Sequence, residues 1–134
     1  ILAGGNTYYT DALYHFGQGM GMGFLIQDDV IDLLASPEVS GKDQASDIRE
    51  GKKTLIHIKA LEKGFDLSQF QRRLSQDEIE EIIARLRGIG VISEVQDSAG
   101  NLVKTGQKRI SILPESEERD LLIQMGDHFI RRSF

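Results

Sequence analysis

The sequence predicts an all-α fold, and three features of the chain support that prediction. Apolar residues recur at helical spacing over most of the 134 residues. The chain contains only two prolines, so long stretches run without a residue that breaks a helix. A capping-box pattern, Ser75 followed three residues later by Glu78, marks the start of one helix directly. We expect a single compact domain over residues 1–134.

The first expected helix spans residues 6–35. Its apolar stripe comprises Leu13, Phe16, Met20, Phe24, Ile31 and Leu34. The helix should end before Pro37, because the residue that precedes a proline is steered away from helical geometry. It contains glycines at alternate positions, namely Gly17, Gly19, Gly21 and Gly23. Each costs about 1 kcal/mol relative to alanine inside a helix, and close approach of a neighbouring helix or ligand is the expected reason.

The middle of the chain is expected to alternate between loop and helix. The stretch SPEVSGKDQASDIREGKKT should form a long loop, and loops of more than about 12 residues are usually functional or disordered. Helical spacing returns over residues 54–63 and stops at Gly64, a residue that suits the C-terminal cap of a helix. The run EIEEIIARLRG, which follows the capping box, should form the next helix.

The segment GVISEVQDSAGNLVKTGQKRISIL could form strands or a helix. Val91, Ile92 and Val95 are typical of strands, and a Gly-Asn pair at 100–101 could form a hairpin turn. A stripe at helical spacing favours one long helix, which Pro114 ends. The stripe comprises Ile92, Val95, Ala99, Leu102, Gly106, Ile110 and Leu113. A last helix should follow, with Leu121 or Leu122, Met125 and Phe129 facing inward.

Composition argues against several classes of function. A net charge of −5 disfavours a general nucleic-acid or membrane-surface binder, since both depend on concentrated positive charge. The absence of cysteine excludes disulfides and thiolate metal sites and makes a cytoplasmic location the default expectation. No apolar run approaches the roughly 20 residues of a membrane span. The chain starts with isoleucine, so we expect it to be part of a longer protein.

Three aspartates crowd one turn near the end of the first helix. Asp28, Asp29 and Asp32 fall within an arc of about 100° on a helical wheel, and Leu25 and Gly21 continue the same face. Two unit charges about 4 Å apart repel by roughly 1 kcal/mol in water and by more at a partly buried surface. Mg²⁺ binds carboxylate oxygens and often shares them with substrate phosphates, so the turn is a candidate metal site. A solvated acidic turn is the alternative.

Basic residues follow the acidic turn in the expected loop. They are Lys42, Arg49, Lys52 and Lys53. Cations beside a metal site suit an anionic ligand that carries several phosphate oxygens, although such charges can also serve only to solvate a loop. The histidines at positions 15, 57 and 128 have no metal-ligand spacing, so each is expected to be structural or exposed.

These motifs resemble a known family. The stretch GFLIQDDVIDLLASPEVSGKDQASDIREGKKTL is similar to the second aspartate-rich region of the trans-isoprenyl diphosphate synthases, the polyprenyl synthetase family that includes geranylgeranyl and farnesyl diphosphate synthases. A DDxxD motif, the pair Gly41-Lys42, Asp47 and the run at 50–54 all occur in the family's order and spacing. The resemblance implies an all-α helical bundle of the isoprenoid synthase type, of which this chain is the C-terminal half.

The resemblance also implies an activity and a set of site residues. The family condenses an allylic diphosphate with isopentenyl diphosphate and depends on Mg²⁺. By resemblance, Asp28, Asp29 and Lys42 are catalytic, and Asp28, Asp29 and Asp32 bind the metal. Lys42, Lys52 and Leu25 bind substrate, and the residue at position 47 completes the surroundings of metal and phosphate.

The same resemblance implies partners. The family's first DDxxD motif is missing from this sequence, so an N-terminal half that carries it is required. A homo-oligomer or hetero-oligomer is expected. Leu25 stands where relatives usually have a polar residue, which leaves open a second possibility, a non-catalytic regulatory partner of a complete prenyl diphosphate synthase.

A different class of protein is suggested by the stretch LSQDEIEEIIARLRGIGVISEVQDSAGNLVKTG, which could form a winged-helix-like nucleic-acid binder. That fold needs strands. The helical stripe and the net acidity of the chain argue against it.

Overall fold

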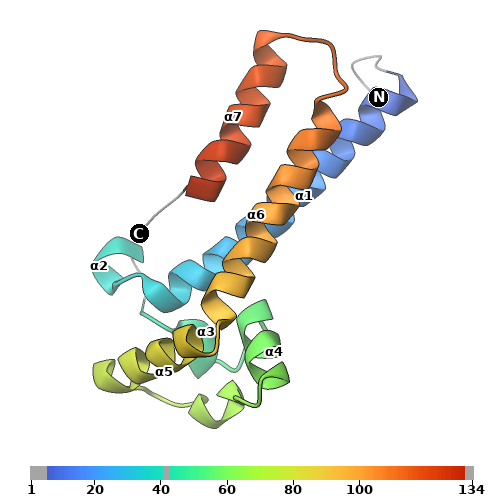
Figure 1. Ribbon diagram of the computed structural model, residues 1–134. Coiled ribbons are helices and arrows are strands. Elements are labelled where there is room, and N and C mark those ends of the chain that lie inside the picture. Colours follow the sequence, from blue (N-terminus) through green and yellow to red (C-terminus); the bar gives the residue numbers. More distant parts are fainter. Residues whose placement is uncertain (1–5, 41–42, 132–134) are drawn as a thin grey trace. The chain divides into compact units, whose positions relative to one another are not determined.

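The computed structural model describes residues 6–40 and 43–131, and every regular element within these ranges is a helix (Figure 1). The all-α prediction is therefore confirmed, and the strands that a winged-helix domain needs do not occur in the described part of the chain. The chain divides into two compact units. Of the described residues, 6–25 and 98–131 form the first unit, and those between 26 and 97 form the second.

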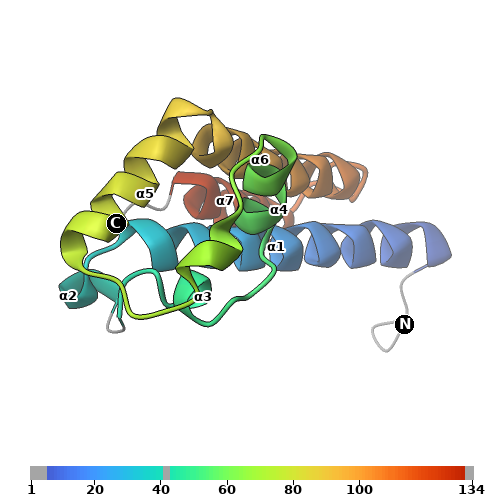
Figure 2. The ribbon, with the colours of Figure 1, turned by 90° about the horizontal axis from the view of Figure 1, so that it is seen from below.

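The first unit is built on an antiparallel pair of helices, α1 (Thr7–Leu34) and α6 (Val91–Ile110), which Figure 1 and Figure 2 show side by side. A Cβ atom at Gly19 would lie 2.6 Å from the carbonyl oxygen of Leu102, and one at Gly23 would lie 2.8 Å from Val103 Cγ2. These glycines let the two backbones approach closely, as the sequence predicted. The neighbouring glycines at 17 and 21 have no such contact.

Helix α7 (Glu117–Arg131) packs on α6 at the side chain of Gln107. The side-chain amide of Gln107 donates to the Ile123 carbonyl at 2.8 Å and to the carboxylate of Asp127 at 3.1 Å. Gly126 is buried against the Gln107 side chain, and this close approach decides which face of α7 points inward.

The prediction that Met125 faces inward is therefore wrong, because its side chain is 50% exposed. Leu121 is exposed as well, and Leu122 takes the inward position. Phe129 is half-buried and packs edge-on against Phe24, with 5.2 Å between ring centroids.

The second unit contains five further helices in addition to the end of α1 and the start of α6. They are α2 (Pro37–Ser40), α3 (Ser46–Arg49), α4 (Leu55–Glu62), the 3-10 helix η1 (Leu67–Phe70) and α5 (Gln76–Gly88). The stretch that the sequence predicted as a long loop thus contains two short helices, α2 and α3. For α3 the cause is a long-range contact, described below, which sequence spacing does not reveal.

Local signals explain where the longer helices of this unit begin and end. The capping box of α5 is complete, with Glu78 N–H donating to the Ser75 hydroxyl and the Glu78 carboxylate accepting from Ser75 N–H. Thr54 caps α4, and Gly64 follows its end with a φ of +83°, a conformation that favours glycine. The helices enclose a core of buried apolar side chains, which includes Val30, Leu33, Ile56, Leu67, Ile82, Leu86 and Val95.

Helix α6 ends at Ile110, three residues before the predicted end of its stripe. The Arg119 guanidinium donates to the carbonyls of Ser111 and Leu113, at 3.4 and 3.1 Å. These carbonyls therefore have a side-chain partner in place of a further helical turn. Within the described ranges, no helix combines the length and apolar character needed to cross a membrane.

Candidate functional site

The predicted acidic turn lies at the end of α1, inside the second unit. Asp28 and Asp29 are half-buried, whereas Asp32 is only 2% exposed. Both carboxylate oxygens of Asp32 have protein donors: the Ser46 hydroxyl at 2.5 Å and the Asp47 backbone N–H at 3.0 Å. Asp32 therefore fastens the start of α3 to α1, a structural role that the sequence did not indicate.

This attachment brings a fourth carboxylate, that of Asp47, to the turn. Burial is the largest cause that raises the pKa of Asp29 from 3.8 to about 6, followed by the charge of Asp47 and a hydrogen bond to its side chain. The charges of Asp32 and Asp28 raise it further. Two carboxyl groups in contact are most stable when they share a proton or a cation. We call residues 28, 29, 32 and 47 the acid cluster.

One predicted cation meets the acid cluster directly. The Lys52 ammonium lies 3.2 Å from Asp47 Oδ1 and 3.5 Å from Glu50 Oε2. The hydrogen bond to Asp47 is the largest cause that raises the pKa of Lys52 above its usual value. A positive charge thus stands beside the acid cluster, on the side chain of Lys52, which is mostly exposed.

Lys52 belongs to a short segment, residues 50–53, which we call the basic turn. Gly51 has a φ of +74°, and a Cβ atom at this position would lie 2.5 Å from the Gln71 side chain. The backbone N–H of Lys52 donates to the Asp47 carbonyl at 3.0 Å. Glycine suits this position best, because the backbone conformation disfavours residues that carry a Cβ atom and the end of the Gln71 side chain would have to move.

The other predicted cations have different surroundings. Arg49 pairs with Asp43 at 3.3 Å, and the Lys53 ammonium lies 3.3 Å from His57 Nε2. Lys42 lies outside the described residues. Within the described ranges, then, Lys52 is the predicted cation that contacts the acid cluster. The sequence did not indicate that the side chain of Lys53 would contact His57.

Leu25, the predicted apolar substrate contact, lies one turn before the acidic turn on α1. Its side chain is 64% exposed. The sequence placed it correctly on the helix that carries the aspartates.

The carboxylates suit a hard cation, but they do not form a complete metal cage. In the part of the chain that the structure describes, no three acidic or histidine side chains are arranged to hold a metal ion. Oxygen donors at positions 29 and 47 have the chemistry that Mg²⁺ prefers, and Mg²⁺ usually takes only one or two protein carboxylates and completes its shell with phosphates and water. The residues therefore fit a metal ion that another ligand shares.

Comparisons with known proteins show what this chain is similar to. A family model described as polyprenyl synthetase matches residues 1–87. The chain is 36% identical over 133 residues to a geranylgeranyl pyrophosphate synthase of Geoglobus acetivorans. This match covers 98% of this chain and 41% of the relative. It is 35% identical to a geranylgeranyl diphosphate synthase of Methanosarcina mazei, across 100% of this chain and 42% of the relative.

Solved structures give the same result. The structure of the geranylgeranyl pyrophosphate synthetase from Geoglobus acetivorans matches with a TM-score of 0.83 and 34% identity, over 96% of this chain and 40% of that one. The enzyme from Pyrococcus horikoshii matches with a TM-score of 0.81 and 32% identity, over 96% and 41%. The chain thus spans about two fifths of the length of the relatives it matches. With the fold and the sequence match in agreement, this chain belongs to the polyprenyl synthetase family.

Proposed function

We propose that this chain is the C-terminal half of a Mg²⁺-dependent trans-prenyltransferase that condenses an allylic diphosphate with isopentenyl diphosphate. The observation that carries the proposal is the contact between Asp29 and Asp47, with the Lys52 ammonium 3.2 Å from Asp47. Family membership supports the reaction class, because relatives that match nearly the whole chain are named as synthases of prenyl diphosphates.

The residues of the acid cluster divide into proposed metal ligands and a positioning residue. Asp28 and Asp29 offer carboxylate oxygens to Mg²⁺, with Asp47 beside them. Asp32 was predicted as a third ligand, but both of its oxygens already accept hydrogen bonds within the protein. Its main contribution is to hold Asp47 in place, which makes it a positioning residue.

The basic residues act on the diphosphate. Bound Mg²⁺ would neutralise the phosphate oxygens and stabilise the charge that develops as the diphosphate leaves. Lys52 can donate to these oxygens when its ammonium leaves the carboxylate of Asp47 and binds the phosphate instead. Lys42 is proposed to make a second contact of the same kind. Leu25 presents an apolar side chain next to the acidic turn, where the hydrocarbon part of the allylic substrate would begin.

The proposal requires the remainder of the site. Because the chain spans about two fifths of its relatives, we propose that an N-terminal half supplies the first DDxxD motif and completes the site. A larger oligomer of such pairs is part of the same proposal. The cytoplasmic location remains a prediction of the sequence.

A regulatory partner without catalytic activity is the second candidate. The observation that favours it is Leu25, an apolar and 64% exposed side chain on the face that carries the aspartates. Replacing it by a polar residue separates the two candidates. Leu25→Gln should change kcat in a catalytic half and should leave the kcat of the partner synthase unchanged if this chain only regulates.

The decisive experiment combines this chain with an N-terminal half that carries the first DDxxD motif. Condensation of isopentenyl diphosphate with an allylic diphosphate should require both chains and Mg²⁺. Asp28→Ala should lower kcat by about 10²–10³-fold, the usual cost of removing one group that stabilises developing charge. Asp97→Ala, at an exposed aspartate of α6, is the matched control and should retain activity. Full activity of Asp28→Ala would rule out the assigned role.

A further inference from the structure

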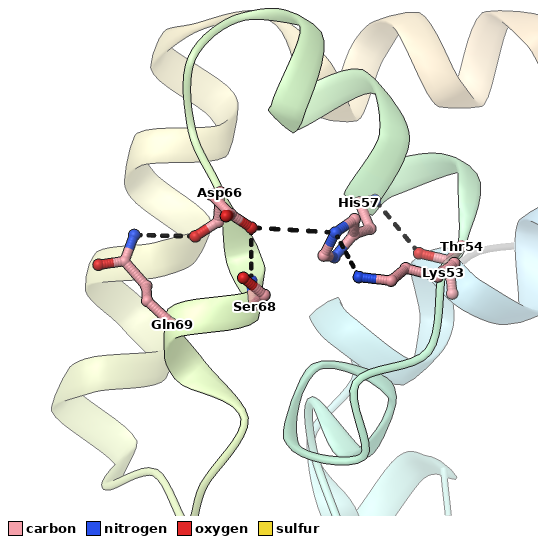
Figure 3. A network of polar contacts seen from close by, with 6 residues as sticks. All are labelled: Lys53, Thr54, His57, Asp66, Ser68 and Gln69. Atoms are coloured by element: carbon pink, nitrogen blue, oxygen red, sulfur yellow. Dashed lines mark hydrogen bonds and ion pairs between the residues drawn. The ribbon is translucent and has the colours of Figure 1, made fainter.

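The imidazole of His57 faces two groups of opposite charge, as Figure 3 shows. His57 lies in α4 and is only 5% exposed. Its Nε2 atom lies 3.3 Å from the Lys53 ammonium, at the end of the basic turn, and 4.0 Å from Asp66 Oδ1, in the link before η1. Among the described residues, these two are the charged groups that act on the ring.

One nitrogen cannot serve both neighbours at once. An ammonium only donates hydrogen bonds, so Nε2 must be unprotonated to accept from Lys53, and the proton of the neutral ring then sits on Nδ1. A carboxylate only accepts, so Nε2 must be protonated to donate to Asp66. The position of the ring proton therefore decides which neighbour Nε2 can bind, and the doubly protonated ring can donate only to Asp66.

The neutral ring is the favoured state near neutral pH. Burial and then the charge of Lys53 lower the pKa of His57 from its usual 6.5, and the charge of Asp66 opposes this shift. In its Nδ1–H tautomer the neutral ring accepts from Lys53, and the segment that carries Lys53 is then held to α4.

The two partners of His57, Asp66 and Lys53, differ in how firmly other contacts hold them. Asp66 Oδ1 also accepts from the Ser68 backbone N–H at 2.9 Å, and the Gln69 amide donates to the Asp66 carbonyl at 2.8 Å (Figure 3). The backbone N–H of His57 donates to the Thr54 hydroxyl at 3.3 Å. Lys53 is a long and exposed side chain, so it is the partner that can leave.

We propose that His57 is a proton-controlled positioning residue for the basic turn. The neutral ring holds Lys53 and so keeps the adjacent Lys52 at the acid cluster, and protonation moves the ring to Asp66 and releases the turn. As a control on diphosphate binding, this inference rests on the proposed function. The exchange of partners by the ring does not depend on it.

The exchange is tested on the ligand-free 134-residue chain by ¹⁵N NMR of its histidines. Above about pH 7, His57 should be the Nδ1–H tautomer, and its titration midpoint should lie below 6.5. Lys53→Met should raise the midpoint by removing a repulsive charge, and Asp66→Asn should lower it by removing an attractive one. His128, which lies in α7, serves as the internal control. If neither substitution shifts the titration midpoint of His57, the proposal is overturned.

The consequence for binding is tested with Mg²⁺ and inorganic diphosphate, by calorimetry from about pH 8 to about pH 5. His57→Gln keeps an acceptor for Lys53 but does not titrate. Asp29 and diphosphate itself titrate in both proteins, so the ratio of the two dissociation constants isolates His57. The ratio should be near one at high pH, and the wild type should bind roughly 2- to 10-fold more weakly at low pH, the size of one lost hydrogen bond.

Parallel pH profiles for wild type and His57→Gln would overturn the control of binding by His57. Absence of binding by either protein at every pH would instead contradict the proposed function. The NMR titration separates these two failures, because it needs no ligand and still decides whether the ring exchanges Lys53 for Asp66.

Discussion

Asp29 and Asp32 lie one turn apart on α1, yet their surroundings give them opposite effects on the free energy of unfolding. Asp32 is buried with a donor on each oxygen, so its charge is compensated within the protein. Burial and, after it, the charge of Asp47 raise the pKa of Asp29 to about 6. The first aspartate stabilises the fold and the second costs stability in the absence of a cation.

The pH dependence of stability should reveal the cost at Asp29. A carboxyl whose pKa is raised by folding binds more protons in the native than in the unfolded chain between 3.8 and about 6, so stability falls as pH rises through that window. Asp29→Asn removes this loss and should be more stable than the wild type at pH 7. Urea unfolding at several pH values measures the difference, which should shrink towards pH 4.

Asp97→Asn is the matched control, since this aspartate is exposed on α6 and lies outside the acid cluster. Its difference from the wild type should change little with pH. A stability difference for Asp29→Asn that is constant between pH 4 and pH 7 would contradict the assigned electrostatic cost.

At the scale of the element, the four glycines of α1 allow a controlled comparison of Gly→Ala substitutions. Gly19→Ala and Gly23→Ala should destabilise the chain, because the new Cβ atoms would meet α6 at 2.6 and 2.8 Å. Gly17→Ala and Gly21→Ala meet no atom within 4 Å in the described structure and should stabilise the helix by about 1 kcal/mol each. Thermal unfolding of the four variants tests the division, and equal effects at all four positions would contradict it.

The sequence predicted the long helices well because their signals are local. The expected limits of α1, residues 6–35, agree with the observed Thr7–Leu34, and the helical stripe correctly excluded a hairpin where α6 lies. The short helices α2 and α3 escaped prediction. For α3 the reason is visible, since its start is held by Asp32, which lies 14 residues before Ser46 in the chain.

The candidate site shows the same limit. Helical spacing placed the three aspartates on one turn, and the order of the motifs placed Lys52 near them. Spacing could not show that Asp32 would bind Ser46, or that Lys53 would turn away to His57. The face of α7 was mistaken for a related reason, because the small size of Gly126 and its contact with Gln107 decide the orientation and apolar periodicity does not.

At the scale of the whole molecule, the proposed metal site is incomplete in the described part of the chain, and the chain is shorter than its relatives. The described residues offer carboxylates to a cation without surrounding it, and the chain spans about two fifths of its relatives. A half site of this kind should bind a metal weakly by itself. Phosphate oxygens can supply the missing ligands, so metal and diphosphate should bind together.

Ligand-induced stabilisation tests this dependence directly. Mg²⁺ alone should raise the melting temperature only slightly, whereas Mg²⁺ with inorganic diphosphate should raise it more. At a ligand concentration of about 100 times the dissociation constant, bound ligand adds up to about 2.7 kcal/mol to the free energy of unfolding. Lys52→Met should weaken the combined effect, because it removes the cation beside Asp47. Lys104→Met, at an exposed lysine of α6, should not. An equally large shift with Mg²⁺ alone would mean that the protein completes the metal site without phosphate, and the shared-ligand mechanism would then be wrong.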